Sequence, residues 1–222
     1  MDHQFDVLIL GSGVAGLTVA LTLLEKGLSV GLVTRARDPN NTNTAYAQGG
    51  IIYTSSEDRQ LVEDIDMASA HTSNLEAAQI LRRHSGRILK EILLKKARTK
   101  FTRDEKGELL FTREAAHTHA RIIYQGDYTG LEIQNSLMKY ILEPGCFPKL
   151  TVLEGHTAID LITPIHHGTD LHQRYEPHKV VGAYLFNRAE EKVVKALARV
   201  TVLATGGVGA VFLHQSNRSD EL

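Results

Sequence analysis

The hydrophobic pattern at the start of the chain predicts a strand, a helix and a second strand. Phe5–Leu10 is an apolar run of the kind found in buried parallel strands. Val14–Lys26 combines helix-forming residues with an apolar face and ends at Gly27, a common helix stop. Ser29–Thr34 is a second apolar run. Together they predict a βαβ unit over residues 5–34, which is the usual size of this motif.

Helical spacing dominates the middle of the chain. Arg35–Thr44 is polar and rich in Asn, which predicts a loop, and a helical insertion is expected over about residues 57–142. Asn74 is a suitable N-cap for a helix, and the DEKG turn within Phe101–Phe111 indicates a hairpin. The helices of the insertion are expected at Glu57–Ala70, Leu75–Ala97 and Thr129–Leu142.

The pattern changes to that of short strands at Leu150. Pro164–His178 is polar and holds four histidines, which predicts an exposed connection. We expect a β-meander and a return strand over about residues 150–207, so the fold class is α/β, with a parallel sheet and helices. Strands with turn signals between them are expected at Leu150–Leu153, Thr157–Ile162, Val180–Asn187, Glu191–Lys195 and Arg199–Ala204.

A Gly-x-Gly-x-x-Gly sequence lies between the first predicted strand and the first predicted helix. The first glycine permits a tight turn, the second lets the backbone approach a pyrophosphate, and the third lets helix and strand pack closely. The N-terminus of the following helix favours the bound anion. The sequence predicts dinucleotide binding, the alternative being a purely structural turn. Its residues are Gly11, Ser12, Gly13, Val14, Ala15 and Gly16.

The acidic residue that normally accompanies NAD binding is absent. A dinucleotide-binding fold expects an acid about 20 residues after the glycines, where it holds the ribose hydroxyls. Thr34 and Arg35 stand there instead. Arg35 could contact a phosphate, as in NADP binding, or lie along an adenine edge, and the residues alone leave both open.

Two further glycine-containing segments resemble FAD-dependent oxidoreductases. Val202–Gly207 reads VLATGG and is similar to the Ala-Thr-Gly-Gly signature at which the chain of those enzymes returns to the dinucleotide sheet after a β-meander. The resemblance implies a Rossmann-like FAD-binding domain, with Thr205 and Gly206 at the cofactor. A second run resembles the loop that contacts the isoalloxazine ring in the succinate dehydrogenase and fumarate reductase superfamily: Asn43, Thr44, Ala45, Tyr46, Ala47, Gln48, Gly49 and Gly50.

Phe111–Ile122 resembles the L-aspartate oxidase family within that superfamily. The segment reads FTREAAHTHARI, and Asp127–Gly130 also fits the family. By this resemblance, Glu114 would pair with the α-amino group of the substrate. A carboxylate there favours a cation that succinate and fumarate lack. A surface salt bridge is the alternative role for Glu114.

Asn43 and two histidines bear on how the cofactor is held. In many succinate dehydrogenases a histidine at the position of Asn43 is bonded covalently to the flavin, and asparagine cannot form this bond. The resemblance therefore implies that FAD is bound without a covalent link. His117 and His119 have no convincing third ligand nearby, so no metal is expected. We expect them to position their segment or to form hydrogen bonds with its neighbours.

The resemblance implies FAD-dependent oxidation of L-aspartate to iminoaspartate, with oxygen or fumarate as the acceptor. This reaction is the first step of de novo NAD biosynthesis through quinolinate, which makes quinolinate synthase a candidate partner. Two other functions stay open at this point. One is a succinate dehydrogenase or fumarate reductase flavoprotein, which Asn43 and Glu114 disfavour. The other is a non-catalytic module that binds FAD or NADP.

Charge, cysteine content and hydropathy limit the remaining classes. The formal net charge of −1 gives no reason to expect a nucleic-acid partner. Cys146 is the only cysteine, so an internal disulfide is excluded and a reducing compartment is expected. Val7–Leu24 is nearly uncharged, but its glycines and the acids in Met1–Asp6 argue against a membrane span or a signal segment. We expect a cytoplasmic protein without a membrane segment.

The resemblance covers nearly all 222 residues but matches only the N-terminal part of the longer family pattern. A capping domain and a C-terminal helical domain are therefore expected to be lacking, together with the family's catalytic arginine and the ligands of the substrate carboxylates. Gln215–Leu222 also lacks the family's onward run to a Gly-Asp-Gly site. We expect a truncated chain that binds FAD weakly and has little activity alone.

Overall fold

The computed structural model of the chain describes residues 2–214, which divide into two compact units. The sheet unit comprises Met1–Asn43 and Ile141–Leu222. The insertion unit comprises Thr44–Tyr140. Gln215–Leu222, for which a departure from the family pattern is predicted, lies outside the described residues.

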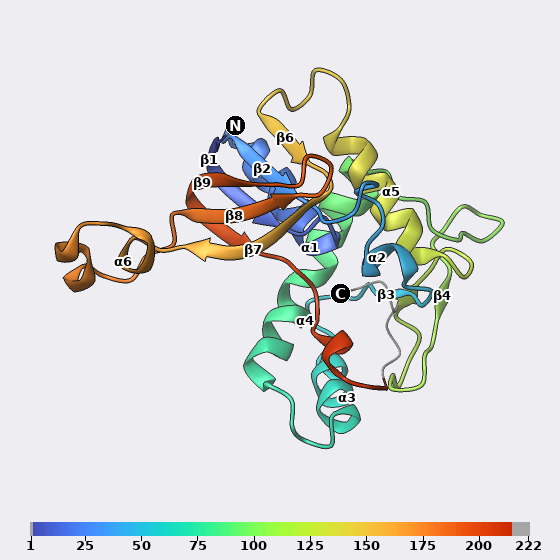
Figure 1. Ribbon diagram of the computed structural model, residues 1–222. Coiled ribbons are helices and arrows are strands. Elements are labelled where there is room, and N and C mark those ends of the chain that lie inside the picture. The colour runs from blue at the N-terminus through green and yellow to red at the C-terminus, as the bar shows by residue number, and fades with distance from the viewer. Residues whose placement is uncertain (1, 215–222) are drawn as a thin grey trace. The chain divides into compact units, whose positions relative to one another are not determined.

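The sheet unit is built on a six-stranded sheet with the order β6-β2-β1-β9-β8-β7 (Figure 1). Neighbouring strands from β6 to β9 are parallel, and β9, β8 and β7 form an antiparallel meander. This arrangement confirms the predicted α/β fold with a parallel sheet and a β-meander. The strands are β1 His3–Leu10, β2 Val30–Val33, β6 Leu150–Leu153, β7 His156–Ile162, β8 Gly182–Asn187 and β9 Lys192–Leu203.

Helix α1, Val14–Leu24, connects β1 to β2 and packs against both strands. Gly27, with a φ of +76°, lies in the turn after the helix, so the predicted helix stop is confirmed. The predicted βαβ unit is therefore present. The helix buries one face, which consists of Gly16, Leu17, Ala20, Leu21 and Leu24.

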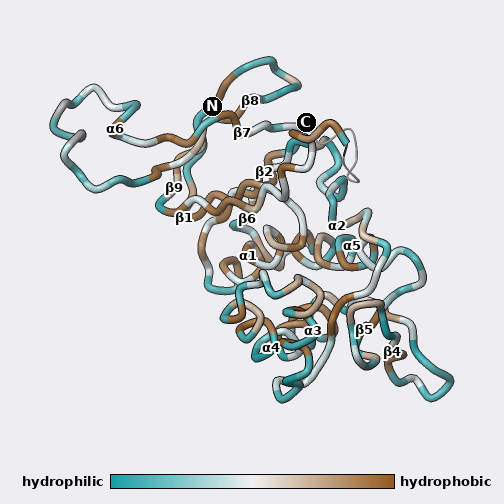
Figure 2. Tube along the Cα trace, turned by 90° about the horizontal axis from the view of Figure 1, so that it is seen from below, coloured by the Kyte–Doolittle hydropathy of each residue, from teal (hydrophilic) through white to brown (hydrophobic). Residues whose placement is uncertain are grey.

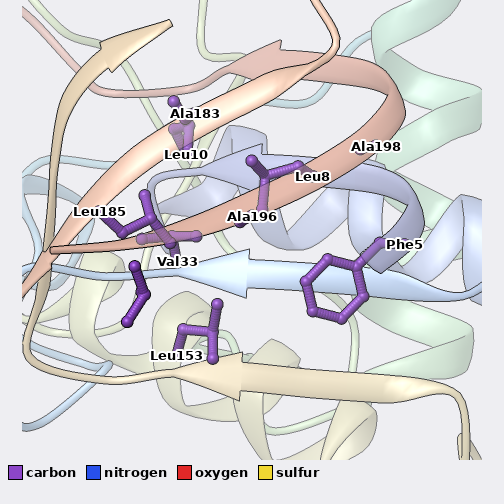
Figure 3. Close-up of a cluster of buried hydrophobic side chains, with 10 residues drawn as sticks. Phe5, Leu8, Leu10, Val33, Leu153, Ala183, Leu185, Ala196 and Ala198 are labelled. Atoms are coloured by element: carbon purple, nitrogen blue, oxygen red, sulfur yellow. The ribbon is translucent and has the colours of Figure 1, made fainter. Parts of the chain in front are cut away.

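A cluster of ten buried side chains forms a hydrophobic core of the sheet unit (Figure 3). It draws residues from β1, β2, β6, β8 and β9, so the meander and the parallel strands share one core. Burial of this apolar surface favours folding. The members are Phe5, Leu8, Leu10, Val33, Leu153, Ala183, Leu185, Val194, Ala196 and Ala198.

Strand β9 differs from the prediction of two separate strands at Glu191–Lys195 and Arg199–Ala204. It runs without a break over twelve residues, because nothing between Lys195 and Arg199 is a turn residue. Its first half pairs antiparallel with β8, and its second half pairs parallel with β1. One strand thus joins the meander to the dinucleotide-type half of the sheet.

The polar segment between β7 and β8 is an exposed connection, as predicted. It contains a short helix, α6 Pro164–His167, and a 3₁₀ turn, η2 Leu171–Tyr175. Tyr175 is 91% exposed. Figure 2 shows mainly hydrophilic and neutral colours along this connection.

The insertion unit combines helices with a small antiparallel sheet of order β3-β5-β4. The hairpin predicted within Phe101–Phe111 is confirmed by an antiparallel bridge between Arg103 and Leu109. The strands are β3 Ile51–Ile52, β4 Phe111–Thr112 and β5 Ile122–Ile123. The helices are α2 Asn43–Tyr46, α3 Gln60–Ala68, α4 Leu75–Leu89 and α5 Thr129–Ile141.

The helix predicted over Leu75–Ala97 has two parts. α4 begins at the predicted cap, where the Asn74 side chain accepts a hydrogen bond from the Ala77 amide at 3.1 Å. After Leu89 the chain continues in π-helical turns, η1 Lys90–Lys96. The cap and the predicted helical segment are confirmed, and the last seven helical residues are π-helical and not α-helical.

No helix within residues 2–214 is long and apolar enough to cross a membrane. The nearly uncharged stretch Val7–Leu24 is divided between β1, a glycine turn and α1.

Candidate functional site

The Gly-x-Gly-x-x-Gly sequence forms a tight turn between β1 and α1. Gly11 has a φ of +115°, a conformation that other residues rarely adopt. A Cβ at Gly11 would overlap the carbonyl oxygen of Ala204, and one at Gly16 would overlap the carbonyl oxygen of Gly11. Gly11 is therefore packed closely against the chain that leaves β9, and a side chain does not fit at position 11 or position 16.

The N-terminus of α1 carries no side-chain cap. Gly13 is the N-cap residue, with an extended conformation at φ −71° and ψ −178°, and the first turn contains no acidic residue. Helix N-termini of this kind favour anions, because the backbone N–H groups and the helix dipole both face them. Val14 and Ala15 follow in the first turn. The residues present therefore fit a pyrophosphate.

Ser12 has a structural partner. Its hydroxyl donates a hydrogen bond to the carbonyl oxygen of Pro39 at 2.8 Å, and the residue is 3% exposed. This bond holds the loop after β2 against the glycine turn. The contact of Ser12 with the cofactor stays a prediction.

The segment after β9 lies beside the glycine turn. Ala204 donates its amide hydrogen to the carbonyl oxygen of Leu10 at 2.8 Å, so the Ala-Thr-Gly-Gly sequence begins where β1 ends. Gly206 has a φ of +78°, and a Cβ built on it would have no neighbouring heavy atom within 4 Å. Thr205 and Gly206 are exposed. Ligands of open α/β sheets bind outside the carboxyl ends of the parallel strands, which is where these residues lie.

Thr34 and Arg35 follow β2 at the same end of the sheet. Thr34 is buried and donates its amide hydrogen to the carbonyl oxygen of Leu153 at 3.0 Å. Arg35 is half-buried. The sheet unit thus brings Arg35 to the same edge as the two glycine turns.

The predicted flavin loop is Asn43–Gly50, of which Thr44–Gly50 belongs to the insertion unit and is held there by two glycine contacts. Gly130, at the start of α5, donates its amide hydrogen to the carbonyl oxygen of Ala47 at 2.9 Å. A Cβ at Gly130 would overlap the carbonyl oxygens of Thr44 and Ala47, and one at Gly50 would overlap Ile122 and Ile123. The helix α2 spans Asn43–Tyr46. Ala45 is half-buried, and Gln48 is exposed.

Glu114 lies at the end of this loop. Its Oε1 accepts a hydrogen bond from the Gly50 amide at 3.2 Å, and a Cβ at Gly49 would be 3.6 Å from the same oxygen. Glu114 is exposed. Within residues 2–214 no ion pair is found for its carboxylate, and its role at the substrate stays a prediction. The loop and Glu114, predicted from separate motifs, are in contact.

His117 and His119 contact protein groups. The Nδ1 of His117 accepts a hydrogen bond from Arg121 at 3.1 Å, and the Nε2 of His119 lies 3.3 Å from Asp58. In the described part of the chain, no three metal-ligating side chains gather. Arg121 and Gly130 lie in the two segments that resemble the L-aspartate oxidase family, but the sequence predicted no contact for either residue, because their partners are distant along the chain.

The profile of the FAD binding domain family matches residues 6–220. L-Aspartate oxidase of Vibrio cholerae is 34% identical over 225 residues, an alignment that covers 97% of this chain and 39% of the relative. The chloroplastic L-aspartate oxidase of Arabidopsis thaliana is 30% identical over 222 residues, covering 96% of this chain and 31% of the relative. The chain thus spans less than half the length of these relatives.

Solved structures share the fold. Mycobacterium smegmatis Sdh1 in complex with UQ1 has a TM-score of 0.83 at 24% identity, covering 98% of this chain and 36% of that chain. The FrdA chain of E. coli quinol fumarate reductase has a TM-score of 0.80 at 21% identity, covering 96% of this chain and 34% of that chain. The described fold therefore matches that of the corresponding part of these two chains.

Proposed function

Because the chain belongs to the FAD binding domain family, we propose that it holds FAD without a covalent bond and serves the oxidation of L-aspartate to iminoaspartate. Asn43 supports the non-covalent link, since an asparagine side chain cannot form the histidyl bond expected of many succinate dehydrogenases. Oxygen or fumarate is the proposed acceptor. The product would serve quinolinate formation in NAD biosynthesis, with quinolinate synthase as the proposed partner.

The contact between Glu114 and Gly50 carries the proposal. It places a carboxylate against the loop proposed to meet the flavin ring, at 3.2 Å from the Gly50 amide. L-Aspartate presents an ammonium group that this carboxylate can bind through a charge-assisted hydrogen bond, whereas succinate and fumarate present none. The carboxylate therefore favours an amino-acid substrate over a dicarboxylic acid without an amino group.

The residues of the chain have binding and orienting roles in this proposal. The turn from Gly11 to Gly16 and the N-terminus of α1 would hold the pyrophosphate, with Thr205 and Gly206 as further cofactor-binding residues. Asn43–Gly50 would contact the flavin ring, and Glu114 would bind the substrate ammonium group. FAD, when bound, supplies the two-electron acceptor, while the protein supplies orientation and electrostatics.

The test uses the purified chain loaded with FAD under anaerobic conditions. Because the chain spans less than half the length of the relatives it matches, we expect L-aspartate to perturb the visible flavin band without rapid bleaching, and we expect succinate at the same concentration to leave the band unchanged. Absorbance spectra before and after each addition provide the measurement. A response to succinate in preference to L-aspartate would favour a succinate dehydrogenase type, and no response to either compound would contradict the proposed substrate.

A further inference from the structure

Arg121 is a buried cation in the insertion unit, immediately before strand β5. The residue is 1% exposed, and its carbonyl oxygen accepts a hydrogen bond from the Tyr53 amide at 2.8 Å. A guanidinium removed from water is costly unless charged and polar partners surround it. The partners of Arg121 therefore identify the segments of the chain that the guanidinium links.

Two buried carboxylates pair with Arg121. Its Nη1 donates to Asp64 at 2.7 Å, and its Nε lies 3.1 Å from Asp58. The two aspartate side chains are 5% and 9% exposed. Nη1 also donates to His117 at 3.1 Å. The guanidinium thus joins the start of the insertion unit to the segment that carries Glu114.

Asp64 holds that segment a second time. Its Oδ2 accepts hydrogen bonds from the amide of Thr118 at 2.9 Å and from the Thr118 hydroxyl at 3.1 Å. Burial by itself would raise the pKa of Asp64, but the hydrogen bonds from Thr118, Arg121 and Gln60 outweigh it and lower the pKa. Asp64 is therefore ionised at neutral pH and acts as a fixed acceptor.

Asp58 is the second carboxylate partner of Arg121, and we call Arg121, Asp58 and Asp64 together the anchor. Its Oδ2 accepts a hydrogen bond from the Thr54 hydroxyl at 2.7 Å, close to where strand β3 ends. Residues 113–120 are otherwise half-buried or exposed. The exposed segment is consequently fixed at Thr118 and Arg121, while the carbonyl oxygen of Glu114 accepts a hydrogen bond from the His117 amide at 3.0 Å.

We propose that Arg121, together with Asp58 and Asp64, is a positioning residue that holds the turn from Glu114 to Thr118 so that the Glu114 carboxylate meets the Gly50 amide. The importance of this position for substrate recognition rests on the proposed function. The coupling between the anchor and Glu114 is a property of the apoprotein. It can therefore be tested without FAD or L-aspartate, and separately from the proposed function.

The experiment is an NMR study of the whole ¹⁵N-labelled chain without cofactor. The Gly50 amide resonance is expected to shift as Glu114 ionises, and Glu114→Gln, which removes the charge, is expected to abolish that shift. In Asp64→Asn, exchange of the Thr118 amide with solvent is expected to accelerate about tenfold or more, as when a hydrogen bond to a charged acceptor is lost. The shift at Gly50 is expected to disappear in the same variant.

Asp66→Asn is the matched control, because Asp66 is also an aspartate of α3 but bonds His71 at 2.7 Å. This variant is expected to keep the Gly50 shift. Arg121→Lys, which keeps a positive charge but loses the forked donors, gives the same readout if Asp64→Asn does not fold. An unchanged Gly50 shift in Asp64→Asn or Arg121→Lys, despite faster exchange at Thr118, would overturn the proposal and leave the anchor a purely structural role.

Discussion

At the residue scale, the proposed function makes substrate choice depend on the negative charge of Glu114. Glu114→Gln keeps the size of the side chain and its ability to accept from Gly50, but it removes the partner for an ammonium group. We expect L-aspartate to bind the FAD-loaded chain about 10- to 100-fold more weakly, since hydrogen bonds to charged groups contribute about 1.5–3 kcal/mol. Titration of the flavin spectrum with L-aspartate measures this change.

Glu105→Gln is the control for this substitution, because it removes an exposed acid from the nearby DEKG turn. It is expected to leave the affinity for L-aspartate unchanged. Equal effects of the two substitutions would show that Glu114 acts only through overall charge.

A substitution at Gly130 tests how the predicted flavin loop is supported. A Cβ in Gly130→Ala would overlap two carbonyl oxygens of the loop, so either the loop or α5 must shift. We expect a loss of about 1–3 kcal/mol in the free energy of unfolding, the range for overpacked sites, together with weaker FAD binding. Leu131→Ala, at the next and 40% exposed position of α5, is expected to change FAD binding little. Thermal unfolding and FAD titration of both variants check this.

Contiguous motifs made part of the site predictable at this scale. The glycine turn, the Thr44–Gly50 loop and Glu114 each lie within a short run of residues. The anchor of Arg121 could not be predicted, because its bond to Asp64 joins residues 57 positions apart. Such a contact depends on how α3 and β5 pack, and no local pattern encodes it.

At the scale of elements, α3 is tied to the segment before β5 through Asp64. The folded-state pKa of Asp64 lies below the ordinary value of about 3.9, so its contribution to stability is fully present above that value and is lost as pH falls through the folded pKa. Asp64→Asn leaves Arg121 with one buried carboxylate partner. We expect the substitution to cost about 3 kcal/mol at pH 7 and progressively less below about pH 4.

Denaturant unfolding of the wild type and Asp64→Asn at several pH values measures that difference. A cost that stays constant from pH 7 to strongly acidic pH would mean that the Asp64 charge is not what stabilises the contact.

Helices and strands could be predicted where the hydrophobic pattern was long or where a cap or turn residue marked an end. The Asn74 cap, the turn at Gly27 and the strands β1, β6 and β7 are examples. The three strands of the small sheet have two residues each, too few for a period of two to appear. β9 was divided in the prediction because the antiparallel and parallel partners that keep it extended are distant in sequence.

At the scale of the whole molecule, the order of the six strands places the glycine turn and the Ala-Thr-Gly-Gly segment at adjacent strand ends. The composition of single strands does not specify this order. The resemblance of the two glycine segments to FAD-dependent oxidoreductases did anticipate the return to the sheet, because those segments contact each other only if β9 lies beside β1. The hydrophobic pattern predicted the helices and strands, and the glycine motifs indicated that β9 lies beside β1.

Titration of the chain with FAD and with NADP tests whether the glycine turn between β1 and α1 binds FAD. We predict saturable one-to-one binding of FAD, followed by flavin absorbance and fluorescence, with no competition from NADP. Gly11→Ala should abolish it, because the new Cβ would overlap the carbonyl oxygen of Ala204. Gly27→Ala, at a positive φ but in open space, should retain it. Tighter binding of NADP than of FAD would contradict the assignment of FAD as the cofactor. FAD binding that is unaffected by Gly11→Ala would contradict its binding at the glycine turn.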